Sequence, residues 1–250
     1  MMGSFFGGFL SVLRRNVWVL AAFLIPLAIR SVSEVLSWFY PLGLDTLNLV
    51  PQIQSGAVFS WGFVGFLHTT GMFTFFATLL YNLTGNLVFT LKFFGPVLLA
   101  VLCGMLFIYA RKALQWGNWK SLLVSVLVAT YFVALRDSWD LYRQTLGLIF
   151  LVAALISLAS LRSPSKYYVA GVFMVLTVLS HELASVILFV IILVEASRLL
   201  VKKSGRESAY LLGSAVLAGG VFLFQRVSLS TSSFGAFSVP ANYVASGPSV

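Results

Sequence analysis

The stretch LKFFGPVLLAVLCGMLFIYARKAL (Leu91–Leu114) decides the fold class of this chain. It carries no charged residue between Phe94 and Ala110, and it does not alternate polar with apolar residues. Because the backbone must satisfy its own hydrogen bonds inside a bilayer, such a run predicts a membrane-spanning helix. Cys103 is the only cysteine, which predicts a packed thiol and excludes an internal disulfide.

The same pattern recurs along the whole chain. The 250 residues are 60% hydrophobic and only 9% charged, which excludes an ordinary soluble domain. We therefore expect an all-α, polytopic membrane bundle over residues 1–226, followed by an irregular extracytoplasmic tail over residues 227–250. The seven expected transmembrane helices are Val17–Val32, Phe94–Ala110, Ser121–Leu135, Leu141–Leu161, Tyr167–Ser180, Leu183–Leu200 and Ala209–Phe224.

A long first loop is expected between the first two spans. Its apolar run Gly56–Tyr81 could form an eighth span, but that span would place Arg111, Lys112 and Lys120 outside the cell. We expect instead two short amphipathic juxtamembrane helices, broken at the sequence LHTTG (Leu67–Gly71).

The basic residues predict the orientation. With a cytoplasmic N-terminus, eleven of the sixteen Lys and Arg residues lie inside, as the positive-inside rule requires for a multi-pass protein of the cell membrane. These cations lie in loops between spans, so the net charge of +9 favours contact with membrane lipids and not with nucleic acid. The remaining five, Arg30, Lys92, Arg136, Arg143 and Arg226, are expected in outer segments.

The acidic residues show the opposite bias. Of the seven, only Glu195 and Glu207 lie toward the cytoplasm, and Glu195 has the spacing of a helical ion pair with Arg198. Acidic residues contribute little to topology, so the clustering of the others suggests a shared site on the outer face. These five are Glu34, Asp45, Asp137, Asp140 and Glu182.

The sequence RDSWDLYR (Arg136–Arg143) holds the densest group of charges. Asp137 and Asp140 are paired carboxylates of the kind that can hold a divalent cation, such as Mn²⁺ or Mg²⁺. Arg136 and Arg143 can bind phosphate through their planar guanidinium groups. The alternative is a set of surface ion pairs at the start of a helix.

Two further segments carry candidate site residues. Asp45 follows the first span, where it could also be a turn residue that bonds its own backbone. His181 could act as a base or a metal ligand, and Glu182 as a metal ligand. The alternative for this second segment is a helix start, with Ser180 as the cap and Glu182 near the positive end of the helix dipole.

This layout resembles the GT-C superfamily of membrane glycosyltransferases, which includes oligosaccharyltransferase catalytic subunits and protein mannosyltransferases. The segment FLHTTGMFTFFATLLYNLTGN (Phe66–Asn86) is similar to the end of the family's first outer loop, and RDSWDLYRQTLGLIF (Arg136–Phe150) to its second acidic loop. The resemblance covers most of residues 33–200. The second acidic motif differs from the family pattern, because it is Asp-x-x-Asp where the family has Asp-x-Asp or Asp-x-Glu.

The resemblance implies transfer of a sugar from a polyprenyl-phosphate-linked donor on the extracytoplasmic face. It implies Asp45 as the catalytic base or a metal ligand, and Asp137 and Asp140 as ligands of a divalent cation. His181 and Glu182 are expected only as further possible ligands. The main alternative is a non-catalytic integral membrane subunit that scaffolds other membrane subunits or binds a lipid carrier. A transporter ranks last, because the charges lie mostly at span ends.

Overall fold

Every secondary-structure element in the described part of this computed structural model is a helix. The structure describes residues 2–37, 45–68, 71–131, 135, 141–160 and 165–231, and the side chains of 16–37, 49–67, 71–131, 135, 141–160 and 165–227. The helices are α1 (Met2–Leu36), α2 (Asp45–Gln54), α3 (Ala57–Ser60), α4 (Gly62–His68), α5 (Met72–Thr84), α6 (Leu87–Lys112), α7 (Asn118–Thr130), α9 (Tyr142–Ser160), α10 (Ser165–Ser180), α11 (Glu182–Val201) and α12 (Gly205–Thr231).

Among the residues that the structure describes, five helical segments are long and apolar enough to cross a bilayer. They are Asn16–Leu36 of α1, the whole of α6, α9 and α11, and Gly205–Val227 of α12. The chain is therefore an integral membrane protein by length and composition. The other two expected spans correspond to α7 and α10, which have only 13 and 16 residues, so a total of seven spans stays a prediction.

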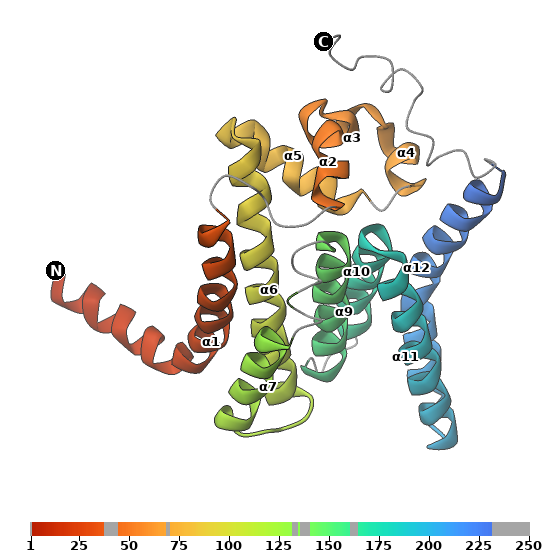
Figure 1. Cartoon of the computed structure of the whole chain (residues 1–250). Coiled ribbons are helices and arrows are strands. Elements are labelled where there is room, and N and C mark those ends of the chain that lie inside the picture. The colour runs from red at the N-terminus through yellow and green to blue at the C-terminus, as the bar shows by residue number, and fades with distance from the viewer. Residues whose placement is uncertain are drawn as a thin grey trace, which may run out of the picture.

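The long helices lie side by side, and the short helices α2, α3, α4 and α5 gather at one end of the bundle (Figure 1). We call this end the capped end and the other the open end. The expected break at LHTTG is confirmed, because α4 ends at His68 and α5 starts at Met72. The segment before the break forms two helices, α3 and α4, where a single helix was expected. The side chain of Asn86 accepts a hydrogen bond from Phe89 N–H at 2.9 Å, which starts α6 earlier than the apolar run suggests.

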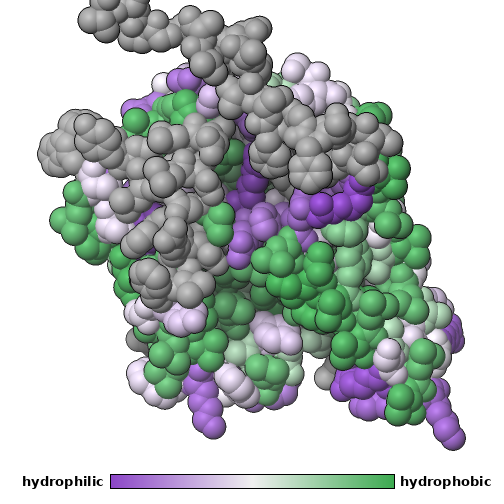
Figure 2. All heavy atoms as spheres, turned by 45° about the vertical axis from the view of Figure 1, so that its right-hand side comes forward, coloured by the Kyte–Doolittle hydropathy of each residue, from purple (hydrophilic) through white to green (hydrophobic). Residues whose placement is uncertain are grey.

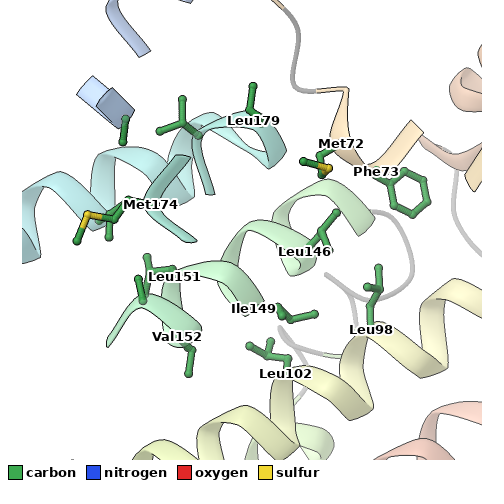
Figure 3. Packing of buried hydrophobic residues seen from close by; sticks show 14 of the residues in the cluster. Met72, Phe73, Leu98, Leu102, Leu146, Ile149, Leu151, Val152, Met174 and Leu179 are labelled. Carbon is green, nitrogen blue, oxygen red and sulfur yellow. The ribbon is translucent and has the colours of Figure 1, made fainter. Parts of the chain in front are cut away.

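The hydrophobic core joins the capped end to the bundle. Figure 3 shows Leu98 and Leu102 of α6 facing the α9 side chains Ile149 and Val152, and Phe73 of α5 near Leu146. The ring of Phe73 lies 5.1 Å from that of Phe94 and 5.2 Å from that of Tyr142. Because Phe73 is fully buried between α6 and α9, α5 is anchored in the core.

An apolar cavity of about 200 Å³ lies between α6, α7 and α9. Its lining includes Leu99, Leu102, Val128 and Leu148. The hydroxyl of Thr145, the polar residue in this lining, donates to Leu141 O at 3.2 Å. The cavity therefore presents almost only hydrocarbon.

Arg30 and Lys92, which were expected in outer segments, lie within α1 and α6, near the ends of these helices at the capped end. That this end is the outer one stays a prediction. The charges of Arg30 and Lys92 are tolerated within helices because they lie beside Glu34, as described below. At the other end of the chain, α12 continues to Thr231, a few residues past the expected boundary at 226, and residues 232–250 lie outside the described part.

Candidate functional site

The predicted site residues that the structure describes lie at the capped end. The structure describes the side chains of Arg143, His181 and Glu182. Asp45 is the first residue of α2, but its side chain is outside the described part. Arg136, Asp137 and Asp140 lie wholly outside the described residues, so their predicted roles are neither supported nor contradicted.

Arg143 connects α9 to two of the short helices. It is the second residue of α9, and its Nη2 group donates to Gln52 Oε1 of α2 at 3.3 Å. The same group lies 3.5 Å from Thr74 Oγ1 of α5. These contacts place a half-buried guanidinium where the short helices cover the bundle.

His181 lies beside this arginine, in the connection between α10 and α11. It is the N-cap residue of α11 in an extended conformation, whereas the hydroxyl of Ser180 donates back to Leu176 O. The suggestion that Ser180 caps the helix is therefore wrong. A Cβ atom on Gly147, one turn after Arg143, would lie 3.1 Å from His181 Cβ. The absence of a side chain at Gly147 thus lets α9 approach the histidine closely.

The environment of His181 favours its neutral form. Burial lowers the pKa of His181 below its ordinary value of 6.5, the neighbouring Glu182 raises this pKa, and Arg143 lowers it further. The Nδ1 atom is buried and has no hydrogen-bond partner among the described residues. A neutral imidazole with an unused nitrogen can accept a proton or bind a metal ion.

The Glu182 carboxylate forms an ion pair with Arg226. Its Oε2 atom accepts a hydrogen bond from Arg226 Nη2 of α12, and both side chains are nearly half exposed. No group of three His, Cys, Asp or Glu residues that could hold a metal ion occurs among the described residues. A site formed with Asp137 and Asp140 therefore stays a prediction.

A second polar group at the capped end is buried between α1 and α6. Arg30, which is fully buried, donates to Glu34 Oε1 at 2.6 Å. Lys92 Nζ donates to Glu34 O at 2.6 Å and to Ser37 Oγ at 2.8 Å, and it lies 3.9 Å from Glu34 Oε2. Lys92 thus holds the last turn of α1, from which the chain continues toward Asp45.

Sequence reasoning missed several polar residues of this end. Gln52 and Thr74 contact Arg143, and the buried Gln225 donates to Leu67 O at 2.9 Å, which ties α12 to α4. The polar pair Gln225 and Arg226 at the end of an apolar helix was a usable signal, whereas Gln52 and Thr74 gave none. Figure 2 shows hydrophilic surface in a recess near this end, bordered by hydrophobic surface.

Comparison with known proteins gives this site no counterpart. No family model matches the chain, and neither a curated protein nor a solved structure shows significant similarity to it.

Proposed function

We propose that this chain is a GT-C-type membrane glycosyltransferase, or the membrane module of one, with its site at the capped end. The observation that carries the proposal is the meeting of Arg143, Gln52, Thr74 and His181, which come from separate elements, at a single end of a membrane bundle. A phosphate bound there would leave its lipid tail in the hydrocarbon of the bilayer.

The helix order supports the same proposal. One long helix is followed by a loop with short helices, and the long helices resume with α6. The short helices cover the end where α9 and α11 begin (Figure 1). This order agrees with the long first loop and juxtamembrane helices that the family resemblance implies.

The proposed chemistry assigns a role to each group. Arg143, and Arg136 with it, would neutralise the phosphate that leaves the sugar. Asp45 would remove a proton from the acceptor hydroxyl or amide, and His181 in its neutral form is a second candidate for this step. A divalent cation, Mn²⁺ or Mg²⁺, would be held by Asp137 and Asp140 and would stabilise the same phosphate. The donor would be a polyprenyl-phosphate-linked sugar.

The test is sugar transfer by the purified full-length protein in lipid nanodiscs. The donors are radiolabelled polyprenyl-phosphate mannose and polyprenyl-pyrophosphate oligosaccharide, each with Mn²⁺, with Mg²⁺ or with a chelator. We expect Asp45→Asn to reduce transfer by about 100-fold or more, the range of general base catalysis. We expect Asp137→Asn to reduce transfer strongly as well, because it removes a proposed ligand of the divalent cation. Arg198→Ala, at the open end, is the control and should leave transfer unchanged. Full transfer by both asparagine variants would overturn the assignment.

The alternative, a non-catalytic subunit, has a distinct signature in the same experiments. It predicts no transfer with any donor, stable co-purification of partner subunits, and no effect of the acidic substitutions on that co-purification. The ion pair between Glu182 and Arg226 favours this alternative. It uses the Glu182 carboxylate for a contact between α11 and α12, so this group needs no metal or substrate to explain its presence.

A further inference from the structure

A second organised polar cluster lies where α10 and α12 begin. The rings of Tyr167 in α10 and Tyr210 in α12 lie 5.6 Å apart at an angle of 37°. Lys166 Nζ lies 4.9 Å from the centre of the Tyr167 ring, and the guanidinium of Arg206 lies 5.5 Å from that of Tyr210. Arg206 Nε also donates to the Tyr210 hydroxyl at 3.1 Å. Each tyrosine ring therefore makes a cation–π contact with one basic side chain.

Close helix packing fixes the position of this ring pair. Gly171 and Ser214 each lie four residues after one of the tyrosines, which is about one helical turn. A Cβ atom on Gly171 would lie 3.0 Å from Ser214 O, so the two helices approach as closely as glycine allows. This close contact between α10 and α12 therefore fixes the positions of the two tyrosines and of the cations beside them.

Most basic residues near the starts of α10 and α12 have no acidic partner among the described residues. Arg198 is paired with Glu195 at 2.6 Å, but Lys166 and Arg206 contact tyrosines. The exposed Lys202 and Lys203 add two positive charges in the turn between α11 and α12, and Glu207 is the exposed acid beside Arg206. In the described part of this region the cations thus outnumber the acids that could neutralise them.

The surface beyond the cluster is apolar and exposed. In the next turns of α10 and α12, Val172 is 60% exposed, Val216 is 70% exposed and Leu217 is 68% exposed. On membrane-spanning helices such side chains contact lipid chains. A ligand that fits both parts has an anionic head group and attached hydrocarbon chains, which distinguishes a lipid from a free anion.

We propose that Lys166, Tyr167, Arg206 and Tyr210 form a binding site for the phosphate of an anionic phospholipid. The Nη groups of Arg206 supply a planar pair of donors to the phosphate, and the ammonium of Lys166 supplies a second charge. The tyrosine rings are amphipathic, which suits a position where the hydrocarbon meets the head groups. This site is at the open end, and it does not depend on the proposed transferase activity.

The test measures phospholipid binding to the full-length protein in detergent micelles by native mass spectrometry. Phosphatidylglycerol is the anionic probe, and phosphatidylcholine is the zwitterionic comparison. We expect the double variant Lys166→Gln/Arg206→Gln to bind phosphatidylglycerol about 25-fold more weakly, since a basic residue near an anionic surface contributes about fivefold each. Tyr210→Phe keeps the ring but removes the hydroxyl that holds Arg206, and it should weaken binding about fivefold.

The matched control is Lys112→Gln/Lys120→Gln, which removes the same charge from exposed positions on α6 and α7 without an aromatic partner among the described residues. It should weaken binding by no more than about twofold. Equal losses in the two double variants would overturn the proposal in favour of general charge attraction, and unchanged binding in Lys166→Gln/Arg206→Gln would overturn it outright. Displacement of the lipid by equimolar inorganic phosphate would also overturn it. Circular dichroism of each variant separates lost binding from lost folding.

Discussion

The two ends of the bundle differ in the burial and the partners of their charged side chains. At the capped end, Arg30 and Glu34 of α1 form a buried pair, which Lys92 joins from α6. At the open end, the pair of Arg198 with Glu195 is exposed and lies within α11. Burial of an ion costs free energy that only close partners offset, whereas exposed ions remain solvated. The capped end is therefore where the fold depends on its charges.

The sharpest way to test this contrast is to break one ion pair at each end. Arg30→Ala leaves Glu34 as a buried charge with one close cation fewer, and it should lower the free energy of unfolding by about 3–5 kcal/mol. Arg198→Ala removes an exposed pair and should cost less than about 1 kcal/mol. Unfolding in mixed micelles with increasing dodecyl sulfate measures both. Similar losses in the two variants would remove the distinction between the ends.

The second test concerns helix contact at the capped end. Gly147→Val places atoms where a Cβ alone would lie 3.0 Å from Ala184 Cβ, so we expect a loss of about 1–3 kcal/mol from overpacking. Gly213→Val in α12 is the control, because a Cβ there meets no atom within 4 Å, and it should change stability by no more than about 0.5 kcal/mol. The same unfolding assay applies. A Gly147 variant as stable as the Gly213 variant would contradict the tight contact of α9 with α11.

The third test uses pH. Because burial lowers the pKa of His181 below 6.5, the folded protein binds this proton less readily than the unfolded chain does. The neutral His181 therefore contributes its full share to the free energy of unfolding above pH 6.5. This contribution falls as the pH decreases from 6.5 to the lower pKa of the folded state, and it does not change further below that pKa. Unfolding measured between pH 5 and pH 8 should show this slope.

The control is His181→Gln, which should flatten the slope. Arg143→Gln should shift the titration of His181 to higher pH, because Arg143 lowers this pKa. Histidine-selective NMR labelling follows the titration directly, since the chain has only two histidines. A His181 signal that titrates above pH 6.5 in the unmodified protein would contradict the buried environment.

The smallest effect is expected at the rim of the capped end. Glu182 and Arg226 are nearly half exposed, so a double-mutant cycle with Glu182→Gln and Arg226→Gln should give a coupling energy of about 0.2–1 kcal/mol. The unfolding assay again supplies the four values. A coupling energy above about 3 kcal/mol would contradict this prediction, because only buried ion pairs are expected to couple so strongly.

Much of the fold could be predicted from hydropathy alone. The run from Phe94 to Ala110 lies within α6, and the break at LHTTG separates α4 from α5. These features depend on local sequence, because an apolar run fixes a helix and a short polar break ends it. The buried Cys103 and the pair of Glu195 with Arg198 are confirmed for the same reason.

The site could be predicted only in part, because its residues meet through tertiary packing. Arg143 and His181 were identified from local chemistry, but their proximity depends on Gly147, whose role only the close packing of α9 against α11 reveals. Arg30 and Glu34 have the spacing of a helical pair, yet Lys92 joins them from a position 58 residues after Glu34. No sequence pattern connects positions so far apart.

The short α7 has a consequence for the membrane itself. Its 13 residues extend about 20 Å, against a hydrocarbon core of about 30 Å, whereas the neighbouring α6 has 26 residues. Figure 1 shows α7 beside only one part of the length of α6. The two helices thus prefer different hydrophobic thicknesses, and lipids that match α6 are too long for α7. If α7 crosses the bilayer, as predicted, the protein should thin the bilayer on the α7 side.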